Sequence, residues 1–356
     1  MCLIIILLMM DSYVLFTTIH PAPYMDIIIR SLKNEHNVQV LYKCEIDKYK
    51  RWKLYKGENG LFFSNMSFIS LFRKVRNSKF VILGGWNSIM SLEIILLSIL
   101  LHKKIAVFSD CPRSIRSKYS FFIKKYILFN LIDYLFCATH TTADFYSKYY
   151  NFNRKNMRFF PYGITFPSES NLCHINKFNE GGHIKIFIAN NFYKRKGYSV
   201  VLKAFEILNN QNILEKFDIT IAGVGEESLF YRNKLSKLSR SIHFLDWLEP
   251  DEYYKYLDQT DIYIHASLFE PFGIPPLEAM ARGKIVIVSD AVQSTCRLIK
   301  NGENGYLYSS YSPNELAEIL RNISLGNISN YVLKAREDVV AMYDCDYGKI
   351  VSDCIN

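Results

Sequence analysis

Two carboxylates flank a turn rich in proline in the segment EPFGIPPLEAMARGKIVIVSD, residues 270–290. Glu270 precedes the turn, and Glu278 follows it in a pattern typical of a helix that leads into a strand. Carboxylate oxygens accept hydrogen bonds from hydroxyl groups such as those of a hexose or a ribose. The first N–H groups of a helix carry partial positive charge and bind phosphate. The segment therefore contains the groups that a phosphorylated sugar ligand requires.

The turn between the two glutamates favours close approach of such a ligand. Gly273 lets the backbone come near a bound group because no side chain intervenes. Pro276 suits the first helical turn, where its missing N–H has no intrahelical partner. We expect the amides of Gly273 and Ile274 to bind phosphate, and we expect Glu278 to lie in the first turn of the helix.

A simpler interpretation of this segment is also open. An acid near the start of a helix is favourable in any α/β protein, and an acid in a loop is commonly solvated. Each glutamate taken alone fits that interpretation. Only the pair, with the glycine turn between its members, indicates a site.

Short apolar runs alternate with longer amphipathic segments along the chain. The strand-like runs are YVLFTTI, VQVLY, FVILGG, KIAVFSD and YLFCAT, and then IKIFIAN, FDITIAG, IHFLDW, IYIHAS and KIVIVSD. Strands that alternate with helices predict parallel sheets covered on both faces. The predicted fold class is therefore α/β, with two doubly wound, Rossmann-like domains in tandem.

A polar stretch with a Gly-Gly pair interrupts the alternation near residues 165–182 and marks a domain boundary. We expect an N-terminal domain over 1–168, a linker over 169–182 and a second domain over 183–330. A C-terminal helical segment over 331–356 is expected to pack back toward the first domain. In such sheets ligands bind beyond the carboxyl ends of the strands, so a two-domain version is expected to bind its ligand between the domains.

The charge balance favours anionic partners. The chain has 43 Lys and Arg against 34 Asp and Glu, a net charge of +9, which suits nucleic acid, anionic lipid or phosphorylated small molecules. Its basic residues are interleaved with aliphatic ones and match no nucleic-acid-binding motif, so we expect no nucleic acid as a partner. The eight cysteines have no metal-ligand spacing, which favours free thiols in a reducing cytoplasm and no metal site.

Two segments raise the question of contact with a membrane. The apolar start, residues 1–10, is too short to span a bilayer as a helix and lacks the basic residues of a signal peptide. It is either a strand extension or a membrane-associated segment. The segment RSIRSKYSFFIKKYILFNLIDYLF, which spans residues 113–136, mixes aromatic residues with lysines. It predicts either an interfacial helix on a membrane or a helix that covers the sheet.

The pair Glu270 and Glu278, with PFG between them and LEAMARGKIVIVSD after, resembles the E-x7-E motif of the retaining glycosyltransferases of family 4, the glycosyl transferases group 1. The similarity continues through IAGVGEE, HFLDWLEPDEYYKYLDQTDIYIHAS and NGENGYLY. In the first half, PAPYMDIIIRSL, VILGGWNS and PYGITF resemble the family loosely. The resemblance implies the GT-B fold, in which an N-terminal acceptor-binding domain and a C-terminal nucleotide-sugar-binding domain face each other across a cleft.

The resemblance also implies roles for individual residues. Lys196, in the Lys-Gly step of NNFYKRKGYSVVLKAF, stabilises the departing nucleotide diphosphate, and Glu270 orients the sugar. Glu278 binds the ribose. The donor-binding residues implied in this way are Glu278, Gly273, Ile274, Phe272, Arg195, Gly223 and Gly225.

The sequence departs from the family pattern at the second diphosphate-binding cation. The family has an arginine a few residues before the Lys-Gly step, and here Asn190 and Asn191 occupy that ground. Arg195 and Lys194 are the candidates to replace it. Without the resemblance, the basic cluster has the simpler interpretation of a solvated helix entrance.

Further departures concern a glycine pair and a histidine. Val292 and Gln293 stand where relatives carry Gly-Gly after a strand, and Cys296 follows further on. Asp110 ends a first-domain strand at which relatives commonly have a histidine. We therefore take Asp110 as a further catalytic candidate, although a loop or helix-cap acid explains it as well.

Three other groups have ordinary explanations. Gly84–Ser88 is either a tight strand-to-helix turn or part of the rim that holds acceptor or phosphate. His140 is interpreted as a structural or capping residue rather than a base. The Asp-Cys-Asp step at 344–346 matches a metal motif only by count.

The resemblance thus predicts a hexosyltransferase that moves a hexose from a nucleotide diphosphate sugar to an acceptor hydroxyl with retention of configuration. It implies no cofactor and no metal, a glycan or lipid-linked acceptor, and a role in surface polysaccharide or lipopolysaccharide synthesis. The expected location is cytoplasmic, with peripheral contact to an anionic membrane at its inner face. The alternative is a catalytically impaired nucleotide-sugar-binding protein of the same fold, because the usual arginine and Gly-Gly pair are missing.

Overall fold

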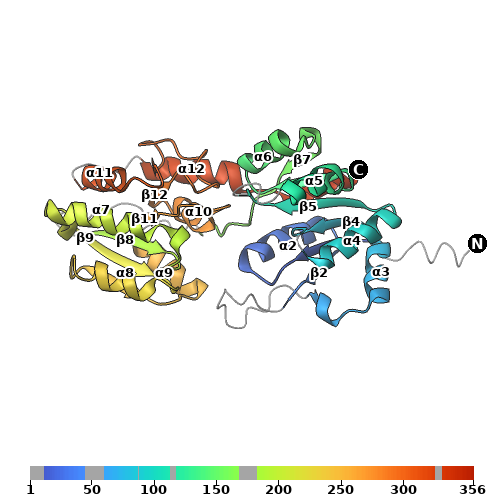
Figure 1. The fold of residues 1–356 in the computed structure, drawn as a ribbon, viewed down its shortest axis with the longest axis horizontal. Helices are drawn as coiled ribbons and strands as arrows, with labels where there is room; N and C mark the ends of the chain where they lie inside the picture. Colours follow the sequence, from blue (N-terminus) through green and yellow to red (C-terminus); the bar gives the residue numbers. More distant parts are fainter. Residues whose placement is uncertain (1–11, 45–59, 87, 113–117, 168–182, 325–330) are drawn as a thin grey trace, which may run out of the picture. The chain divides into compact units, whose positions relative to one another are not determined.

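The computed structural model describes residues 12–44, 60–86, 88–112, 118–167, 183–324 and 331–356 (Figure 1). The chain divides into two compact units. Unit 1 comprises Met1–Gly163 and Cys345–Asn356, and unit 2 comprises Ile164–Asp344. Of the predicted segments, residues 1–10 and the whole linker, residues 169–182, lie outside the described residues.

Unit 1 is built on a parallel sheet, seven-stranded within its described part, in the order β3-β2-β1-β4-β5-β6-β7 (Figure 1). The strands are β1 (Tyr13–Thr18), β2 (Val38–Tyr42), β3 (Leu61–Phe62), β4 (Ser78–Leu83), β5 (Lys104–Ser109), β6 (Tyr134–Cys137) and β7 (Met157–Phe159). Their apolar runs are buried on both faces, as β1 shows, because helices cover both sides of a parallel sheet.

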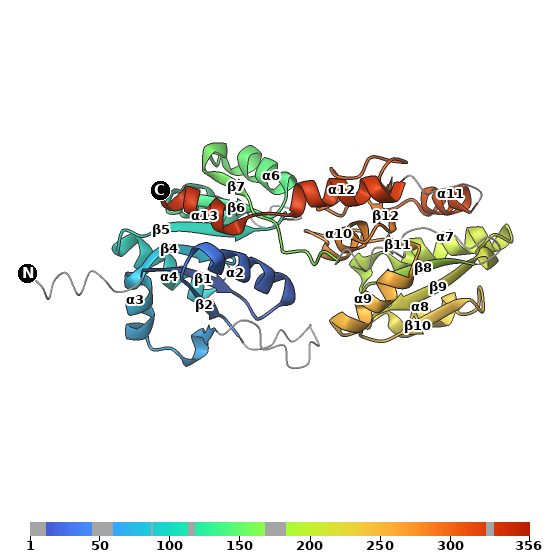
Figure 2. The same cartoon turned by 180° about the vertical axis from the view of Figure 1, so that it is seen from behind.

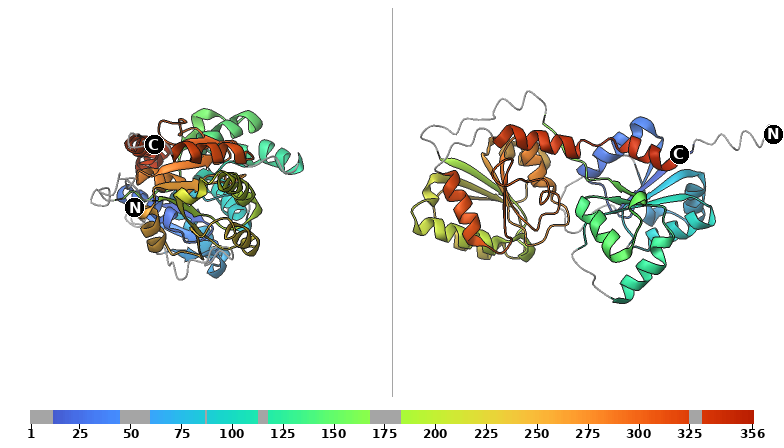
Figure 3. Two further views of the ribbon diagram at one scale, coloured as in Figure 1. Left: turned by 90° about the vertical axis from the view of Figure 1, so that its left-hand side faces the viewer. Right: turned by 90° about the horizontal axis from the view of Figure 1, so that it is seen from above.

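The helices of unit 1 connect these strands. They are α2 (Pro23–Glu35), α3 (Phe68–Asn77), α4 (Ile89–Leu100), α5 (Lys118–Tyr126), α6 (His140–Tyr150) and α13 (Tyr347–Ile355). Serine or threonine caps begin α3, α4 and α6 by accepting a backbone N–H. The last helix, α13, packs against α2 (Figures 2 and 3). There His36 Nε2 lies 3.1 Å from the carbonyl oxygen of Gly348.

Unit 2 holds a second parallel sheet, in the order β10-β9-β8-β11-β12-β13. Its strands are β8 (Ile184–Ala189), β9 (Phe217–Ala222), β10 (Ile242–Leu245), β11 (Ile262–His265), β12 (Ile285–Ser289) and β13 (Tyr306–Tyr308). Its helices are α7 (Tyr198–Asn210), α8 (Ser228–Leu235), α9 (Pro250–Gln259), α10 (Ile274–Ala281), α11 (Pro313–Ile323) and α12 (Tyr331–Tyr343).

Alternate side chains of β8 face the two helical layers of unit 2. Ile186 and Ile188 join the core beneath α7 and α11, which pack side by side (Figure 2). Phe187 points the other way, toward Tyr253 of α9, with their rings 6.0 Å apart. The two-residue period of a strand accounts for this division.

The strand order reverses between β8 and β11 in unit 2, because the chain adds β9 and β10 on one side and β12 and β13 on the other. At such a switch point the loops that follow the two central strands diverge and leave room for a ligand. The loop after β8 carries Lys196, and the loop after β11 carries Glu270. The topology therefore brings Lys196 and Glu270 to the same edge of the sheet, where the parallel strands end.

The observed units confirm the predicted fold class of two doubly wound, parallel α/β domains. The division between the units falls at Gly163 and Ile164, a few residues before the predicted boundary. The C-terminal segment is shared, since α12 belongs to unit 2 and α13 to unit 1. Among the described helices, none is long and apolar enough to cross a membrane.

Candidate donor site in unit 2

The position of Lys196 is set by the glycine after it. Residues Lys194–Lys196 form one 3-10 turn, and Gly197 then takes a left-handed conformation with φ +71° as α7 begins. A Cβ at Gly197 would overlap the carbonyl oxygen of Ala266, just past β11. Only glycine combines this backbone conformation with so close an approach. The entrance of α7 is thereby pressed against the end of β11.

This approach brings Lys196 onto Glu270, 74 residues later in the chain. The Lys196 ammonium donates a hydrogen bond to Oε2 of Glu270, and the two side chains are only 11% and 13% exposed. Arg195 Nη1 reaches the same oxygen at 3.2 Å from the more exposed side. Two cations from one loop therefore hold the predicted sugar-orienting carboxylate.

Two further groups complete the surroundings of Glu270. Ser267 Oγ donates to Oε2 at 3.2 Å, and His265 Nε2 lies 3.5 Å from the same atom. Within the described part of the chain, all the side-chain contacts that fix this carboxylate are made to Oε2. The other oxygen, Oε1, makes none of these contacts.

The pKa values follow from this arrangement. Burial opposes the ionisation of Glu270, but the charge of Lys196, the hydrogen bond from His265 and the charge of Arg195 outweigh it and lower the pKa of Glu270. Burial lowers the pKa of Lys196, and the neighbouring Glu270 partly offsets that effect. Glu270 is therefore a carboxylate at neutral pH, an acceptor rather than an acid.

The turn after Glu270 has the form that the sequence predicts. Gly273 adopts φ +100° as the N-cap of α10, and a Cβ there would lie 2.6 Å from Cγ1 of Val292. Ser294 holds the turn through its hydroxyl, which donates to the carbonyl oxygen of Gly273 at 2.8 Å, and its N–H, which donates to that of Phe272. The Phe272 ring is buried, 6.0 Å from that of Tyr343. The helix entrance is therefore rigidly placed.

Glu278 lies in the second turn of α10, which corrects the prediction of a first-turn position. The helix begins at Ile274, so both prolines fall in its first turn and Glu278 is the fifth helical residue. Its side chain is buried, and Oε1 accepts a hydrogen bond of 2.7 Å from the hydroxyl of Tyr254. Burial raises the pKa of Glu278, against the hydrogen bond from Tyr254 and the charge of Arg282.

Part of this chain, including these loops, is similar to a known protein family. Residues 174–338 match the model of the family "Glycosyl transferases group 1". This part of the chain is therefore similar to the glycosyltransferase group 1 family. The match includes both loops that meet at Glu270 and both glutamates of the E-x7-E motif.

Curated relatives cover the same part. An uncharacterized glycosyltransferase of Methanocaldococcus jannaschii is 29% identical over 167 residues, 46% of this chain and 41% of the relative. A phosphatidyl-myo-inositol mannosyltransferase of Mycobacterium leprae is 28% identical over 180 residues, 49% of this chain and 45% of the relative. The chain thus spans less than half the length of either of these relatives.

Solved structures extend the likeness to the whole fold. HepE of Anabaena, solved with UDP and glucose, superposes with a TM-score of 0.74 at 13% identity and covers 97% of this chain and 99% of its own. The lipopolysaccharide outer core galactosyltransferase WaaB, in its apo form, gives a TM-score of 0.69 at 16% identity, covering 96% and 98%. The chain has the GT-B fold of these glycosyltransferases, as predicted.

Within unit 2, the glycine loop after β9 packs against the loop after β8. A Cβ on Gly223 would overlap the carbonyl oxygen of Asn190, and one on Gly225 would meet that of Phe192. Both glycines adopt positive φ, +147° and +157°. Close packing of two strand-end loops is thus one reason for these glycines, and their predicted contact with a donor stays a prediction.

The departures from the family pattern receive structural explanations. Arg195 contacts Glu270, so it supplies a second cation at the site. Val292 replaces the first residue of the usual Gly-Gly pair, and its buried side chain fills the space beside Gly273. Gln293 donates its N–H to the carbonyl oxygen of Glu270 at 3.2 Å. The loop after β12 therefore still holds the turn that carries Glu270.

Asp110, the remaining catalytic candidate, belongs to unit 1. It follows β5, and its Oδ2 accepts a hydrogen bond of 3.2 Å from the hydroxyl of Tyr162. Its catalytic role stays a prediction. In the Gly84–Ser88 step, the N–H of Gly84 donates to the carbonyl oxygen of Thr17 at 2.8 Å, which fits a tight turn after β4; Asn87 lies outside the described residues.

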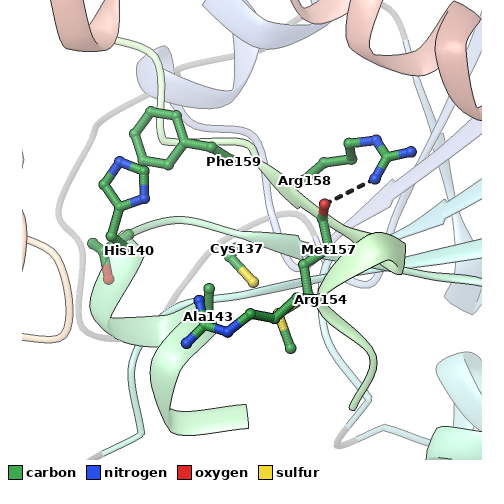
Figure 4. A pocket seen from close by; sticks show the side chains of 8 residues that line it. Cys137, His140, Ala143, Arg154, Met157, Arg158 and Phe159 are labelled. Carbon is green, nitrogen blue, oxygen red and sulfur yellow. Dashed lines mark hydrogen bonds between the residues drawn. The ribbon is translucent and has the colours of Figure 1, made fainter. Parts of the chain in front are cut away.

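His140 lines a pocket of about 200 Å³ beside α6 and β7 (Figure 4). Thr139, not His140, is the N-cap of α6, since its hydroxyl accepts the N–H of Thr142. The imidazole of His140 stacks on Phe159 with ring centroids 4.7 Å apart. This packing fits a structural role for His140.

Sequence reasoning missed three groups that contact the two glutamates. His265 and Ser267 contact Glu270, and Tyr254 contacts Glu278. The only sequence signal for the first two was their polar character directly at the end of a buried strand, where a switch-point loop begins. Tyr254 lies on an amphipathic helix and gave no signal of its own.

Proposed function

We propose that the protein transfers a hexose from a nucleotide diphosphate sugar to an acceptor hydroxyl, with retention of configuration and without a metal or other cofactor. The observation that carries this proposal is the meeting of Lys196, Arg195 and Glu270 at the switch point of the glycosyltransferase domain. Retention and metal independence rest on the resemblance of the E-x7-E motif to retaining family 4 enzymes.

The chemistry assigned to these groups is mainly electrostatic. The bond between the anomeric carbon and the diphosphate oxygen breaks, and the electron pair leaves with the nucleotide diphosphate. Lys196, Arg195 and the amides of Gly273 and Ile274 stabilise that growing negative charge. The acceptor hydroxyl approaches on the leaving-group side, forms the new glycosidic bond and gives its proton to the departing diphosphate oxygen. Glu270 orients the sugar through Oε1, because its cationic and hydrogen-bonding neighbours hold Oε2.

Glu278 is assigned to the ribose of the donor. Its carboxylate is buried, and its Oε1 accepts a hydrogen bond of 2.7 Å from the Tyr254 hydroxyl. A ribose diol would supply the hydrogen bonds that stabilise the charged form against the burial that raises its pKa. Donor binding is therefore expected to be linked to ionisation of Glu278.

The alternative of an impaired nucleotide-sugar binder arose from the missing arginine. Arg195 speaks against it, because its guanidinium lies 3.2 Å from the carboxylate that Lys196 also holds. Turnover decides between the two: a binder without catalysis would be stabilised by the nucleotide yet would release no nucleotide diphosphate from a nucleotide sugar.

A thermal-shift screen tests the proposal. UDP, GDP, ADP, UDP-glucose and GDP-mannose are added to the wild type and to Glu278→Gln. At 100 times its Kd, a ligand of the folded state adds about 2.7 kcal/mol to the free energy of unfolding. We expect one nucleotide series to raise the Tm of the wild type and to lose most of that effect in Glu278→Gln.

The control variant is Glu318→Gln, an exposed acid on α11 of the same unit. It should respond to the nucleotide as the wild type does. The proposal fails if millimolar nucleotides leave the wild-type Tm unchanged, or if Glu278→Gln responds like Glu318→Gln.

The acceptor is proposed to be lipid-linked, at an anionic membrane on the cytoplasmic side. Exposed apolar side chains on α4 and α5 of unit 1 support this partner, together with Lys124 and Lys125 of α5. The apolar side chains are Ile89, Leu92, Leu96, Ile99 and Leu100 on α4, and Tyr119, Phe122, Ile123 and Tyr126 on α5. Lys124 lies over the ring of Trp86, just before α4, so basic and apolar groups adjoin. Such a mixture suits an anionic lipid surface.

Vesicle flotation tests this partner. We expect the protein to float with vesicles of phosphatidylglycerol and phosphatidylcholine, less with phosphatidylcholine alone, and less at 0.5 M salt. Phe122→Asp combined with Ile123→Asp should lower the bound fraction severalfold, because charged side chains do not enter the acyl boundary. Leu229→Asp, at an exposed leucine of α8 in unit 2, is the control. Equal binding by both variants would contradict the membrane assignment.

A further inference from the structure

His265 is a buried imidazole with a partner at each ring nitrogen. It ends β11 at the switch point and is 1% exposed. Nε2 lies 3.5 Å from Oε2 of Glu270. On the other side, Nδ1 lies 3.2 Å from Nδ2 of Asn190 and 3.4 Å from the hydroxyl of Tyr263. The ring thus connects the loop after β8 with the carboxylate after β11.

Asn190 is itself firmly held. It is buried directly after β8, and its N–H donates to the carbonyl oxygen of Ala222 at 3.0 Å. Its carbonyl oxygen accepts a hydrogen bond of 2.7 Å from the hydroxyl of Tyr198. With the backbone fixed on both sides, the side-chain amide has little freedom except to face His265.

The chemistry of these partners determines where the imidazole proton lies. The amide nitrogen of Asn190 is a donor, so it requires Nδ1 of His265 to be an acceptor. The single proton of a neutral ring then resides on Nε2 and is donated to Glu270. The opposite tautomer would place the lone pair of Nε2 against a carboxylate oxygen, which is repulsive. The single proton of the Tyr263 hydroxyl can be donated either to Nδ1, at 3.4 Å, or to the carbonyl oxygen of Ala189, at 3.3 Å, and donation to Nδ1 agrees with this assignment.

We propose that Asn190 and His265 form a positioning pair: Asn190 holds His265 in the Nε2–H tautomer, and His265 fixes the rotamer of Glu270 with a neutral hydrogen-bond donor. The functional consequence rests on the proposed role of Glu270 in orienting the sugar. A neutral donor positions this carboxylate without adding a third positive charge to the two that Lys196 and Arg195 already supply. Asn190 therefore acts on the Glu270 carboxylate, through His265, and does not bind the diphosphate of the donor.

The charged and titratable groups around the ring favour its neutral form. Burial lowers the pKa of His265; Glu270 acts in the opposite direction, whereas Lys196 and Arg195 add to the lowering. The Tyr263 hydroxyl is neutral at these pH values because burial raises its pKa. No change in the charge of His265 is thus expected near pH 7.

Asn190→Asp changes this balance in a predictable direction. An aspartate carboxylate beside Nδ1 accepts a hydrogen bond from the protonated Nδ1 and raises the pKa of His265. At low pH the ring then carries both protons and still donates to Glu270. As the pH rises through the new pKa, the remaining proton moves to Nδ1 and the contact with Glu270 is lost. Turnover by Asn190→Asp should therefore fall with rising pH where the wild type is flat.

The experiment uses the full chain labelled with ¹⁵N-histidine, whose ring nitrogens report the tautomer by NMR. The signals of His265 are identified by their loss in His265→Gln. In the wild type we expect a neutral ring with its proton on Nε2 from pH 6 to 8, and in Asn190→Asp a titrating ring. Asn191→Asp is the matched control, because it adds the same charge one residue away, where the side-chain oxygen faces the N–H of Val224.

Kinetics with the donor found in the nucleotide screen give the second readout. His265→Gln keeps an amide donor near Glu270 and should retain more activity than His265→Phe. For His265→Phe, kcat should fall about 10- to 100-fold, the cost of misplacing a group by about 1 Å. The thermal shift with the nucleoside diphosphate alone should persist, since Glu270 is assigned to the sugar.

The two readouts separate this proposal from the proposed function. A wild-type proton on Nδ1, a charged ring at pH 7, or identical His265 signals in Asn190→Asp and Asn191→Asp would overturn the positioning pair whatever the chain catalyses. Absence of turnover with every donor would instead contradict the enzymatic function, and the NMR result would still decide the tautomer. If His265→Phe does not fold, comparison of Asn190→Asp with Asn191→Asp still tests the proposal.

Discussion

Replacing Lys196 with methionine is expected to lower the rate of sugar transfer by about 10²- to 10³-fold, the usual effect of removing one group that stabilises developing negative charge. Methionine is nearly as long as lysine and apolar, so it fills the same largely buried position beside Glu270 without the charge. Arg195, Ser267 and His265 remain around the carboxylate. The loss should therefore appear in kcat, measured by release of the nucleoside diphosphate, with a folded protein.

Lys194→Met is the matched control for this variant. Lys194 lies in the same 3-10 turn but is exposed, so its replacement should change the rate less than about threefold, in line with weak surface electrostatics. A double-mutant cycle with Glu270→Gln adds a check on the contact itself. Because Lys196 and Glu270 act as a unit, the combined loss should be smaller than the sum of the single losses. Equal rates for Lys194→Met and Lys196→Met would contradict the assignment.

Gly197→Ala is expected to destabilise the protein by about 3 kcal/mol or more. Overpacking costs ~1–3 kcal/mol, and a side chain in the left-handed region adds about 1–2 kcal/mol. Both act here, because the new Cβ would overlap the carbonyl oxygen of Ala266 at φ +71°. Relief of that overlap would move the entrance of α7 away from β11 and carry Lys196 from Glu270. Activity per folded molecule should then fall as well.

Gly302→Ala separates the cost of the steric overlap from the cost of the left-handed backbone conformation. Gly302 has a similar φ of +77° in the same unit, but a Cβ there would meet nothing within 4 Å. Its free energy of unfolding, measured by urea titration, should therefore fall only by about 1–2 kcal/mol, the cost of the backbone conformation. If the two alanine variants were equally stable, the close approach to Ala266 would not be what positions the entrance of α7.

Much of the donor site could be predicted because its residues lie in short local patterns. The strand runs were visible as buried apolar segments, and the turn EPFGIPPLE was visible through its glycine and prolines. The resemblance singled out Lys196, and Arg195 was chosen as a substitute from the same loop. The structure places both on Glu270, and their catalytic roles remain predictions for the experiments above.

Other features could not be predicted because they depend on packing between distant segments. The position of Glu278 in the second turn of α10 depends on a helix start at Ile274, which Gly273 and its neighbour Val292 determine. In the sequence, Asn190 only stood, with Asn191, where the family has an arginine. Only the structure shows its amide 3.2 Å from His265, 75 residues later in the chain.

The sequence by itself determined the two α/β units and the two loops that carry the candidate site, because periodicity and turn residues are local properties of the chain. The tertiary structure alone decided which atoms of those loops meet. Gly197 against Ala266, Arg195 on Glu270 and Asn190 on His265 all follow from the adjacency of β8 and β11 in the sheet. Adjacency of strands that are far apart in the chain is a property of sheet packing, and no local pattern encodes it.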